Sequence, residues 1–212
     1  MQDKPLEGIK ILELSSIVTA SLATMILCDQ GSEVIKVEPT GLGDSMRYLG
    51  TQKGGFSAIF ANCNRGKQSL NLNLKDKKEL KILLKLVGEA DVFISNFRLG
   101  VNEKLGLGRE ALIKINPNLI YVSITGFGEE GPLSSAPAYD HVIQGMSGAT
   151  SIQSSDDKPA YIKTLIFDKN GSTTNWWVPN CEYALKRHIM LNVLFSKGSA
   201  QIVPEQKAFF SY

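Results

Sequence analysis

The sequence has few of the residues on which metal centres and nucleophilic triads depend. Its 212 residues include three cysteines and two histidines. Cys28, Cys63 and Cys181 lack the close pairing of a zinc knuckle, and their odd number is typical of a reducing compartment. His141 and His188 lie in unrelated contexts, which leaves little material for a Ser-His-Asp triad. We therefore expect no bound metal ion.

A strong excess of one charge and long apolar runs are also missing. The formal net charge is +2 and the pI about 8.3, which is too small and too evenly spread to indicate a nucleic-acid surface or a polybasic membrane anchor. No apolar run approaches the roughly 20 residues of a membrane-spanning helix, and the N-terminus contains no signal-peptide core. These features predict a cytoplasmic protein that binds neither nucleic acid nor membrane.

What the sequence does contain is a series of apolar segments that stop at polar or glycine residues. The segments are 9–14, 34–37, 91–95 and 119–124. They run into Ser15-Ser16, Glu38-Pro39, Asn96-Phe97-Arg98 and Thr125-Gly126. In open α/β sheets, ligands bind beyond the carboxyl ends of the strands, so these polar residues are placed for contact rather than for packing.

Helical segments alternate with these predicted strands. Residues 21–30 can form a helix that Thr19 or Ser21 caps, and residues 77–89 have leucines on one face and lysines on the other. Alternation of strand and helix predicts right-handed βαβ units. We therefore expect an α/β fold, with a Rossmann-like, mostly parallel sheet flanked by helices.

The glycine motifs do not predict a dinucleotide site. Neither Gly41-Leu42-Gly43 nor Gly126-Phe127-Gly128 completes the Gly-x-Gly-x-x-Gly pattern between a first strand and its helix. The first strand-to-helix turn, residues 15–21, contains no glycine at all. NAD binding is therefore not expected.

Short motifs follow one another in a particular order along residues 5–171. They are Pro5-Leu6-Glu7-Gly8, Gly43-Asp44 with Arg47, Asn64-Arg65-Gly66-Lys67, Asn96-Phe97-Arg98-Leu99-Gly100, Leu105-Gly106-Leu107-Gly108, Asn116-Pro117, Gly126-Phe127-Gly128, Tyr139-Asp140-His141 and Asp168-Lys169. In this order they resemble the family III coenzyme A transferases, the group that includes formyl-CoA and carnitine-CoA transferases and methylacyl-CoA racemases. The resemblance implies CoA transfer between an acyl-CoA and a small carboxylic acid, with no permanently bound cofactor, in an interlaced homodimer.

The resemblance also implies roles for particular residues. Asp168 matches the catalytic aspartate, which attacks the acyl-CoA thioester and later carries CoA as an aspartyl thioester. Its sequence context alone favours an ordinary helix N-cap, and it is the resemblance that implies the catalytic role. The positions matched to CoA contacts are Val18, Thr19, Leu72, Asn73, Leu74, Lys75, Asn96, Phe97, Arg98, Lys104, Tyr139 and Asp140. Lys104 stands where an arginine is common, and Pro39 and Pro137 replace residues that are basic in some members.

Agreement with the family fades after Gly171, where Trp176-Trp177-Val178-Pro179 interrupts an expected helix. Family members are about twice as long and have a second, smaller domain. We therefore expect residues 1–171 to form the N-terminal part of the large domain and residues 172–212 a divergent tail, in a truncated or disrupted chain that lacks the second domain.

Two other functions stay open at this point. Racemases of the superfamily have a Gly-His-Asp-like motif where this chain has Ala138-Tyr139-Asp140. A tyrosine with a pKa of about 10 is a poorer proton shuttle at neutral pH than a histidine with a pKa of about 6.5. This favours transfer over racemisation. The second alternative is an inactive CoA-binding fragment of a disrupted gene. The acyl donor and acceptor are not predicted.

Overall fold

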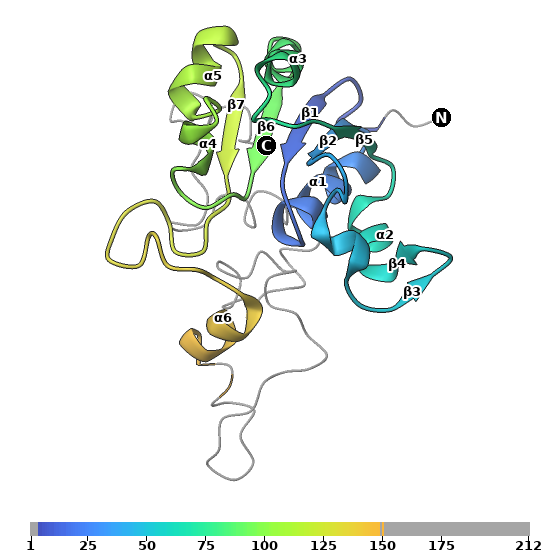
Figure 1. Ribbon diagram of the computed structural model, residues 1–212, viewed down its shortest axis with the longest axis vertical. Helices are drawn as coiled ribbons and strands as arrows, with labels where there is room; N and C mark the ends of the chain where they lie inside the picture. The colour runs from blue at the N-terminus through green and yellow to red at the C-terminus, as the bar shows by residue number, and fades with distance from the viewer. Residues whose placement is uncertain (1–3, 149, 151–212) are drawn as a thin grey trace.

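The computed structural model describes residues 4–148 and Thr150, and its centre is a five-stranded sheet (Figure 1). The strands are β1 (Lys10–Leu14), β2 (Glu33–Glu38), β5 (Gln68–Asn71), β6 (Val92–Ser95) and β7 (Ile120–Ser123). Their order is β5-β2-β1-β6-β7, and all four pairings are parallel. The predicted parallel α/β sheet is confirmed. The strand order reverses between β1 and β6, which makes their carboxyl ends a topological switch point.

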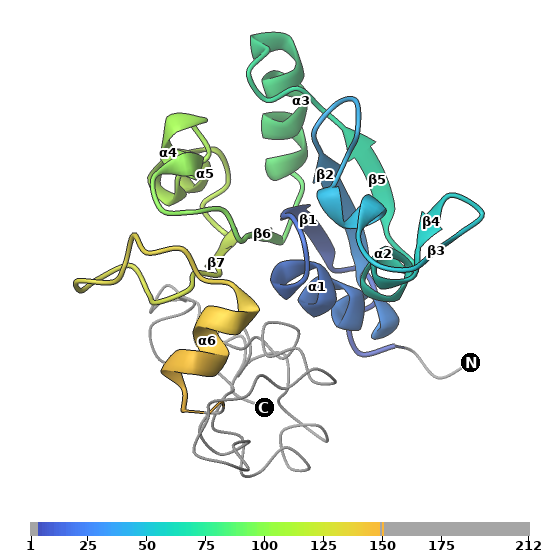
Figure 2. The same ribbon diagram turned by 60° about the horizontal axis from the view of Figure 1, so that its bottom comes forward.

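Helices cover both faces of this sheet (Figure 2). Successive strand residues point to opposite sides, so each face presents apolar side chains that a helix can cover. Ile11 and Ile94 pack with α1 (Thr19–Asp29), whereas Leu12 and Phe93 pack with α3 (Lys77–Val87) and α5 (Arg109–Ile115). Helix α3 is amphipathic as predicted, with Leu83 and Val87 completely buried. Two apolar cores therefore hold the sheet between them.

The predicted cap of α1 is wrong. Its N-cap is Val18, which has no side-chain cap hydrogen bond with any described residue. The Ser21 hydroxyl instead donates to the Glu13 carboxylate, and the Thr19 hydroxyl accepts a hydrogen bond from Asn96. Tertiary partners have replaced the local interaction that the sequence suggested.

Residues 41–66 form an excursion beside α1. It consists of a 3-10 turn, η1 (Ser45–Tyr48), an antiparallel hairpin of β3 (Gln52–Lys53) and β4 (Phe56–Ser57), and α2 (Ala58–Asn64). Met46 and Phe60 pack with Val18 in a third, smaller apolar cluster. This cluster joins the excursion to the beginning of α1, where the first strand meets its helix.

Two short helices, α4 (Val101–Lys104) and α6 (Asp140–Met146), complete the described part of the chain. Within that part no helix has the length and apolar character needed to cross a bilayer. Asp168, the boundary at residue 171 and the tail of residues 172–212 lie outside the described residues.

Candidate functional site

A cleft of about 520 Å³ opens at the carboxyl ends of β1 and β6. Its wall consists of residues 16–19 after β1, residues 96–99 and Val101 after β6, residues 124–126 after β7, residues 134–139 and Ile143 of α6. The cleft therefore lies at the switch point of the sheet, the place at which open α/β folds bind ligands.

Six of the twelve predicted CoA-contact residues line this cleft. They are Val18, Thr19, Asn96, Phe97, Arg98 and Tyr139. Arg98 is exposed and forms no ion pair with any described residue. Tyr139 is 57% exposed. The structure thus brings together residues from the first turn, from the end of β6 and from the segment before α6.

The Asn96 side chain holds the turn after β1. Its Oδ1 accepts from the Ser16 amide at 3.0 Å, and its Nδ2 donates to the Ser16 carbonyl at 2.8 Å and to the Thr19 hydroxyl at 3.0 Å. The carboxamide of Asn96 is therefore engaged within the protein, and its effect on the cleft is to fix the position of the β1–α1 turn.

The other six predicted contacts do not line the cleft. Leu72, Asn73, Leu74 and Lys75 follow β5, which is two strands away from β1 at the edge of the sheet. Leu72 is buried and Leu74 packs against the same core, so neither presents its side chain to a ligand at the cleft. Lys104 is exposed at the end of α4. Asp140 begins α6 next to Tyr139, and its Oδ2 accepts from Gln144 Nε2 at 2.7 Å.

The electrostatics of the cleft favour an anion. Helix α1 begins at the cleft wall, and its first turn contains no acidic residue. The first amides of a helix lack intrahelical acceptors and carry the positive end of the helix dipole. Together with the guanidinium of Arg98, this end of the sheet is suited to phosphate or carboxylate groups.

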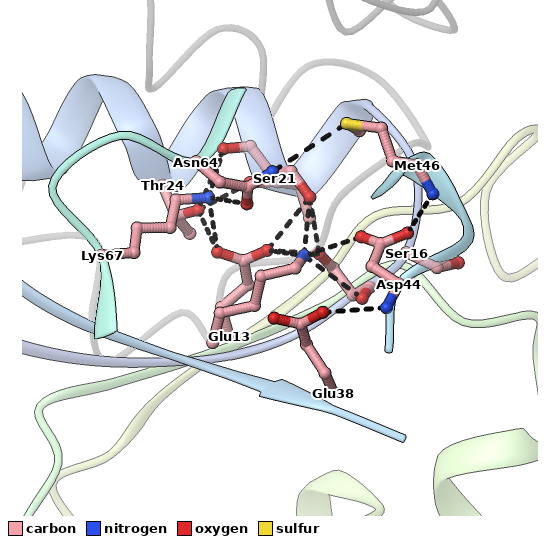
Figure 3. Close-up of polar contacts among 12 residues, drawn as sticks. Glu13, Ser16, Ser21, Thr24, Glu38, Asp44, Met46, Asn64 and Lys67 are labelled. Atoms are coloured by element: carbon pink, nitrogen blue, oxygen red, sulfur yellow. Dashed lines mark hydrogen bonds and ion pairs between the residues drawn. The ribbon is translucent and has the colours of Figure 1, made fainter. Parts of the chain in front are cut away.

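Sequence reasoning missed a buried charge cluster behind the cleft, formed by Glu13, Lys36, Asp44 and Lys67 (Figure 3). Lys36 Nζ lies 2.7 Å from Glu13 Oε1 and 3.0 Å from Asp44 Oδ2, and Lys67 Nζ lies 2.7 Å from Glu13 Oε2. The sequence contained a signal for this cluster, because Glu13 and Lys36 each interrupt an apolar strand. The structure pairs these two positions in register on adjacent strands. Opposite charges at matched positions of adjacent buried strands indicate an ion pair.

Burial and mutual attraction compete in setting the pKa values of the cluster. Burial alone would raise the pKa of Glu13, but Lys36 and Lys67 outweigh it and hold the value at about 2. For Lys36, the attraction of Glu13 and Asp44 exceeds the effect of burial, so its pKa is raised. For Lys67 burial dominates over Glu13 and lowers the pKa to about 8.

A second ion pair connects β2 to the excursion. Glu38, the last residue of β2, accepts from Arg47 Nη2 at 2.6 Å and Nε at 2.7 Å, and from the Asp44 amide at 2.8 Å. Gly43 has a φ of +70°, and a Cβ there would lie 2.8 Å from Glu38 Oε2. The Gly43-Asp44 and Arg47 motif therefore builds this turn rather than a phosphate loop.

The described residues contain neither a metal-ligand cluster nor a histidine in the cleft wall. No group of three or more histidine, cysteine, aspartate or glutamate side chains in this part of the chain is arranged to hold a metal ion. His141, the nearest histidine to the racemase motif, is exposed and is not among the residues of the cleft wall.

Comparison with known proteins points to one family. The acetyl-CoA:oxalate CoA-transferase of Acetobacter aceti is 44% identical over 155 residues, which are 73% of this chain and 40% of that protein. The succinyl-CoA:glutarate CoA-transferase of Homo sapiens is 43% identical over 154 residues, 70% of this chain and 34% of that protein. The chain therefore spans two-fifths or less of the length of these curated relatives.

Solved structures agree with this result. The crystal structure of a CAIB/BAIF family protein from Brucella suis has a TM-score of 0.75 and 40% identity, over 81% of this chain and 47% of that one. The family model for CoA-transferase family III matches residues 6–176, from before the first strand to beyond the last described helix. The parallel sheet and the cleft at its switch point agree with this match. The chain belongs to CoA-transferase family III.

Proposed function

We propose that this chain carries the CoA-binding and nucleophilic part of an enzyme that moves coenzyme A between an acyl-CoA and a small carboxylic acid. The observation that supports this most is the cleft at the β1/β6 switch point, in which the beginning of α1 and Arg98 face the same space. The names of the relatives supply the reaction class, since each pairs an acyl-CoA with a carboxylate acceptor, oxalate or glutarate.

The chemistry of CoA matches the groups around the cleft. CoA carries phosphates, an adenine and a long amide-containing arm, so it needs amides or cations at one end and an apolar wall along the rest. Arg98 and the first amides of α1 supply the positive groups, and Val18, Phe97 and Tyr139 supply apolar or aromatic surface. In this proposal the side chains after β5 contribute less than those after β1 and β6.

Asp168 is the proposed nucleophile. Its carboxylate attacks the thioester carbonyl, forms a mixed anhydride and releases CoA thiolate. The thiolate then attacks the aspartyl carbonyl, which gives an aspartyl-CoA thioester and releases the original acyl group as a carboxylate. The acceptor carboxylate attacks that thioester, the thiolate leaves again and returns to the acceptor's acyl carbon, and Asp168 is regenerated. No metal or redox cofactor takes part.

The assembly and location of the protein belong to the same proposal. Resemblance to the family supports an interlaced homodimer for a protein that includes the second domain, and the three scattered cysteines are consistent with the reducing cytoplasm. Light scattering on a form extended with that domain tests the first point. A monomer of the extended form at micromolar concentration would contradict it.

Calorimetric titration with CoA tests the binding site. Arg98→Ala should weaken binding about tenfold, which corresponds to about 1.4 kcal/mol. Lys81→Ala is the control, because Lys81 is an exposed lysine of α3 that does not line the cleft. Equal effects of the two substitutions would remove the case for this site. Absence of CoA binding by the unmodified chain would contradict both CoA transfer and the inactive CoA-binding fragment, whereas CoA binding without transfer would favour the fragment.

A further inference from the structure

Ile17, in the wall of the cleft, has an unusual backbone conformation. Its φ is +61°, and it is the one residue other than glycine with a positive φ in the part of the chain that the structure describes. The left-handed region is unfavourable for residues with a Cβ and especially so for a β-branched side chain. Such a conformation persists only where surrounding contacts enforce it, and it is concentrated at functional sites.

The contact at Ile17 comes from Asp44, the N-cap of η1. Asp44 Oδ1 accepts from the Ile17 amide at 3.1 Å and from the Met46 amide at 2.9 Å. The Asp44 side chain is buried, and its other oxygen lies 3.0 Å from Lys36 Nζ. Lys36 is itself held by Glu13 at 2.7 Å. A chain of buried contacts therefore runs from the centre of the sheet to the backbone of the cleft wall. Figure 3 shows Glu13 and Asp44 within it.

Capping of η1 does not account for this arrangement. The cap needs only an oxygen that reaches the Met46 amide, which a serine or an asparagine also supplies. A buried ion pair contributes little net stability relative to apolar packing, so the pairing of Asp44 with Lys36 is poorly explained by stability alone. The pairing does fix the direction in which the carboxylate points, and that direction includes the Ile17 amide.

We propose that Asp44, oriented by Lys36, is a positioning residue that keeps Ile17 in the left-handed conformation and thereby gives the cleft the shape that binds CoA. Asn96 holds Ser16 from the β6 side, and Asp44 holds Ile17 from the η1 side, so the turn is fixed at two successive residues. The part of this inference that concerns CoA rests on the proposed function.

The test is a cycle of four variants of the full chain, with the dissociation constant of CoA measured by calorimetry. Asp44→Ser is introduced into an Ile17→Ala background and into an Ile17→Gly background. Serine keeps an N-cap for η1 but is too short to replace the carboxylate. Alanine and glycine both remove the isoleucine side chain, and they differ in the Cβ that penalises a positive φ.

If Asp44 positions the turn, its loss should weaken CoA binding about tenfold in the alanine background, equivalent to about 1.4 kcal/mol. In the glycine background the loss should be about threefold or less, because glycine adopts the conformation without help. A general loss of folding would affect both backgrounds equally. Equal losses would therefore overturn the proposal.

Amide hydrogen exchange of Ile17 separates this inference from the proposed function, because it needs no ligand. The Ile17 amide of the unmodified chain should be protected, and Asp44→Ser should accelerate its exchange at least about tenfold. The Leu22 amide, which donates to the Val18 carbonyl, is the control and should change little.

If the chain does not bind CoA, the proposed function fails and the exchange rates still decide the role of Asp44. If Asp44→Ser does not fold, the unmodified chain decides: protection of Ile17 supports the proposal and an unprotected amide overturns it.

Discussion

The buried charge cluster and the cleft lie side by side at the carboxyl end of β1, and their charges are satisfied differently. Within the cluster each lysine faces a carboxylate at 3.0 Å or less. In the cleft, Arg98 is exposed without an ion pair among the described residues. Charges that the chain neutralises itself serve the fold, because an unpaired buried charge is costly. Charges left facing solvent in a cleft are available to a ligand.

The largest effect should come from substitution of the proposed nucleophile, which belongs to the CoA chemistry and not to the buried charge cluster. In a preparation that shows CoA transfer, Asp168→Ala should lower turnover by at least about 10³, because the attacking atom is lost. Asp140→Ala is the control and should leave measurable activity. Peptide mapping after borohydride reduction of the trapped thioester should label a peptide that contains Asp168. A label elsewhere, or near-normal transfer by the alanine variant, would contradict the mechanism.

On the structural side, Glu13→Gln should lower the free energy of unfolding by about 3–5 kcal/mol, because two buried lysines lose their common carboxylate. Glu110→Gln makes the same chemical change on an exposed residue of α5 and should alter stability by less than about 0.5 kcal/mol. Urea denaturation followed by circular dichroism measures both. Similar values for the two variants would show that the buried charge cluster does not stabilise the fold.

Acid should weaken the same cluster without any substitution. The pKa of Glu13 is lowered from 4.5 to about 2, so the folded state binds its proton less readily than the unfolded state. The stabilisation is therefore present above pH 4.5 and is lost as the pH falls toward 2, by on the order of 3 kcal/mol. Glu38, whose pKa is also about 2, acts in the same direction. Denaturation midpoints measured between pH 6 and 2 test this, and in Glu13→Gln the decrease should be smaller.

The smallest effects should come from the predicted contacts that lie away from the cleft. Lys75→Ala and Lys104→Ala should each weaken CoA binding about twofold or less, because neither lysine lines the cleft and exposed charges are screened by salt. Calorimetry beside Arg98→Ala gives the ranking. A loss as large as that of Arg98→Ala would extend the site along the sheet edge to β5 or α4.

The periodic parts of the sequence predicted the periodic parts of the fold. The apolar segments correspond to β1, β2, β6 and β7, and the amphipathic pattern corresponds to α3. Local patterns suffice here because burial on one face or both faces imposes a period that can be read directly. The order of the motifs also indicated the family, since many weak motifs in one order are specific together.

Individual side-chain roles were less predictable. Thr19 and Ser21 are good caps in local terms, but Asn96 and Glu13 bind their hydroxyls in the folded protein. Leu72 and Asn96 were both predicted as ligand contacts, yet one is in the core and the other holds the backbone of Ser16. A hydrogen bond between residues as far apart as Asn96 and Ser16, separated by 80 positions, leaves no trace in a local pattern.

The sequence by itself determined the class of fold, the family and the candidate nucleophile, because these depend on apolar periodicity and on the order of motifs. The tertiary structure alone decided which polar residues face one space and which neutralise one another. The order β5-β2-β1-β6-β7 places Arg98 beside the beginning of α1 and removes Lys75 to the sheet edge. It also brings Asp44 to the amide of Ile17, across 27 residues of chain. Side-chain function in this protein follows from that strand order, since contact in space, rather than spacing in sequence, sets electrostatic and hydrogen-bond partners.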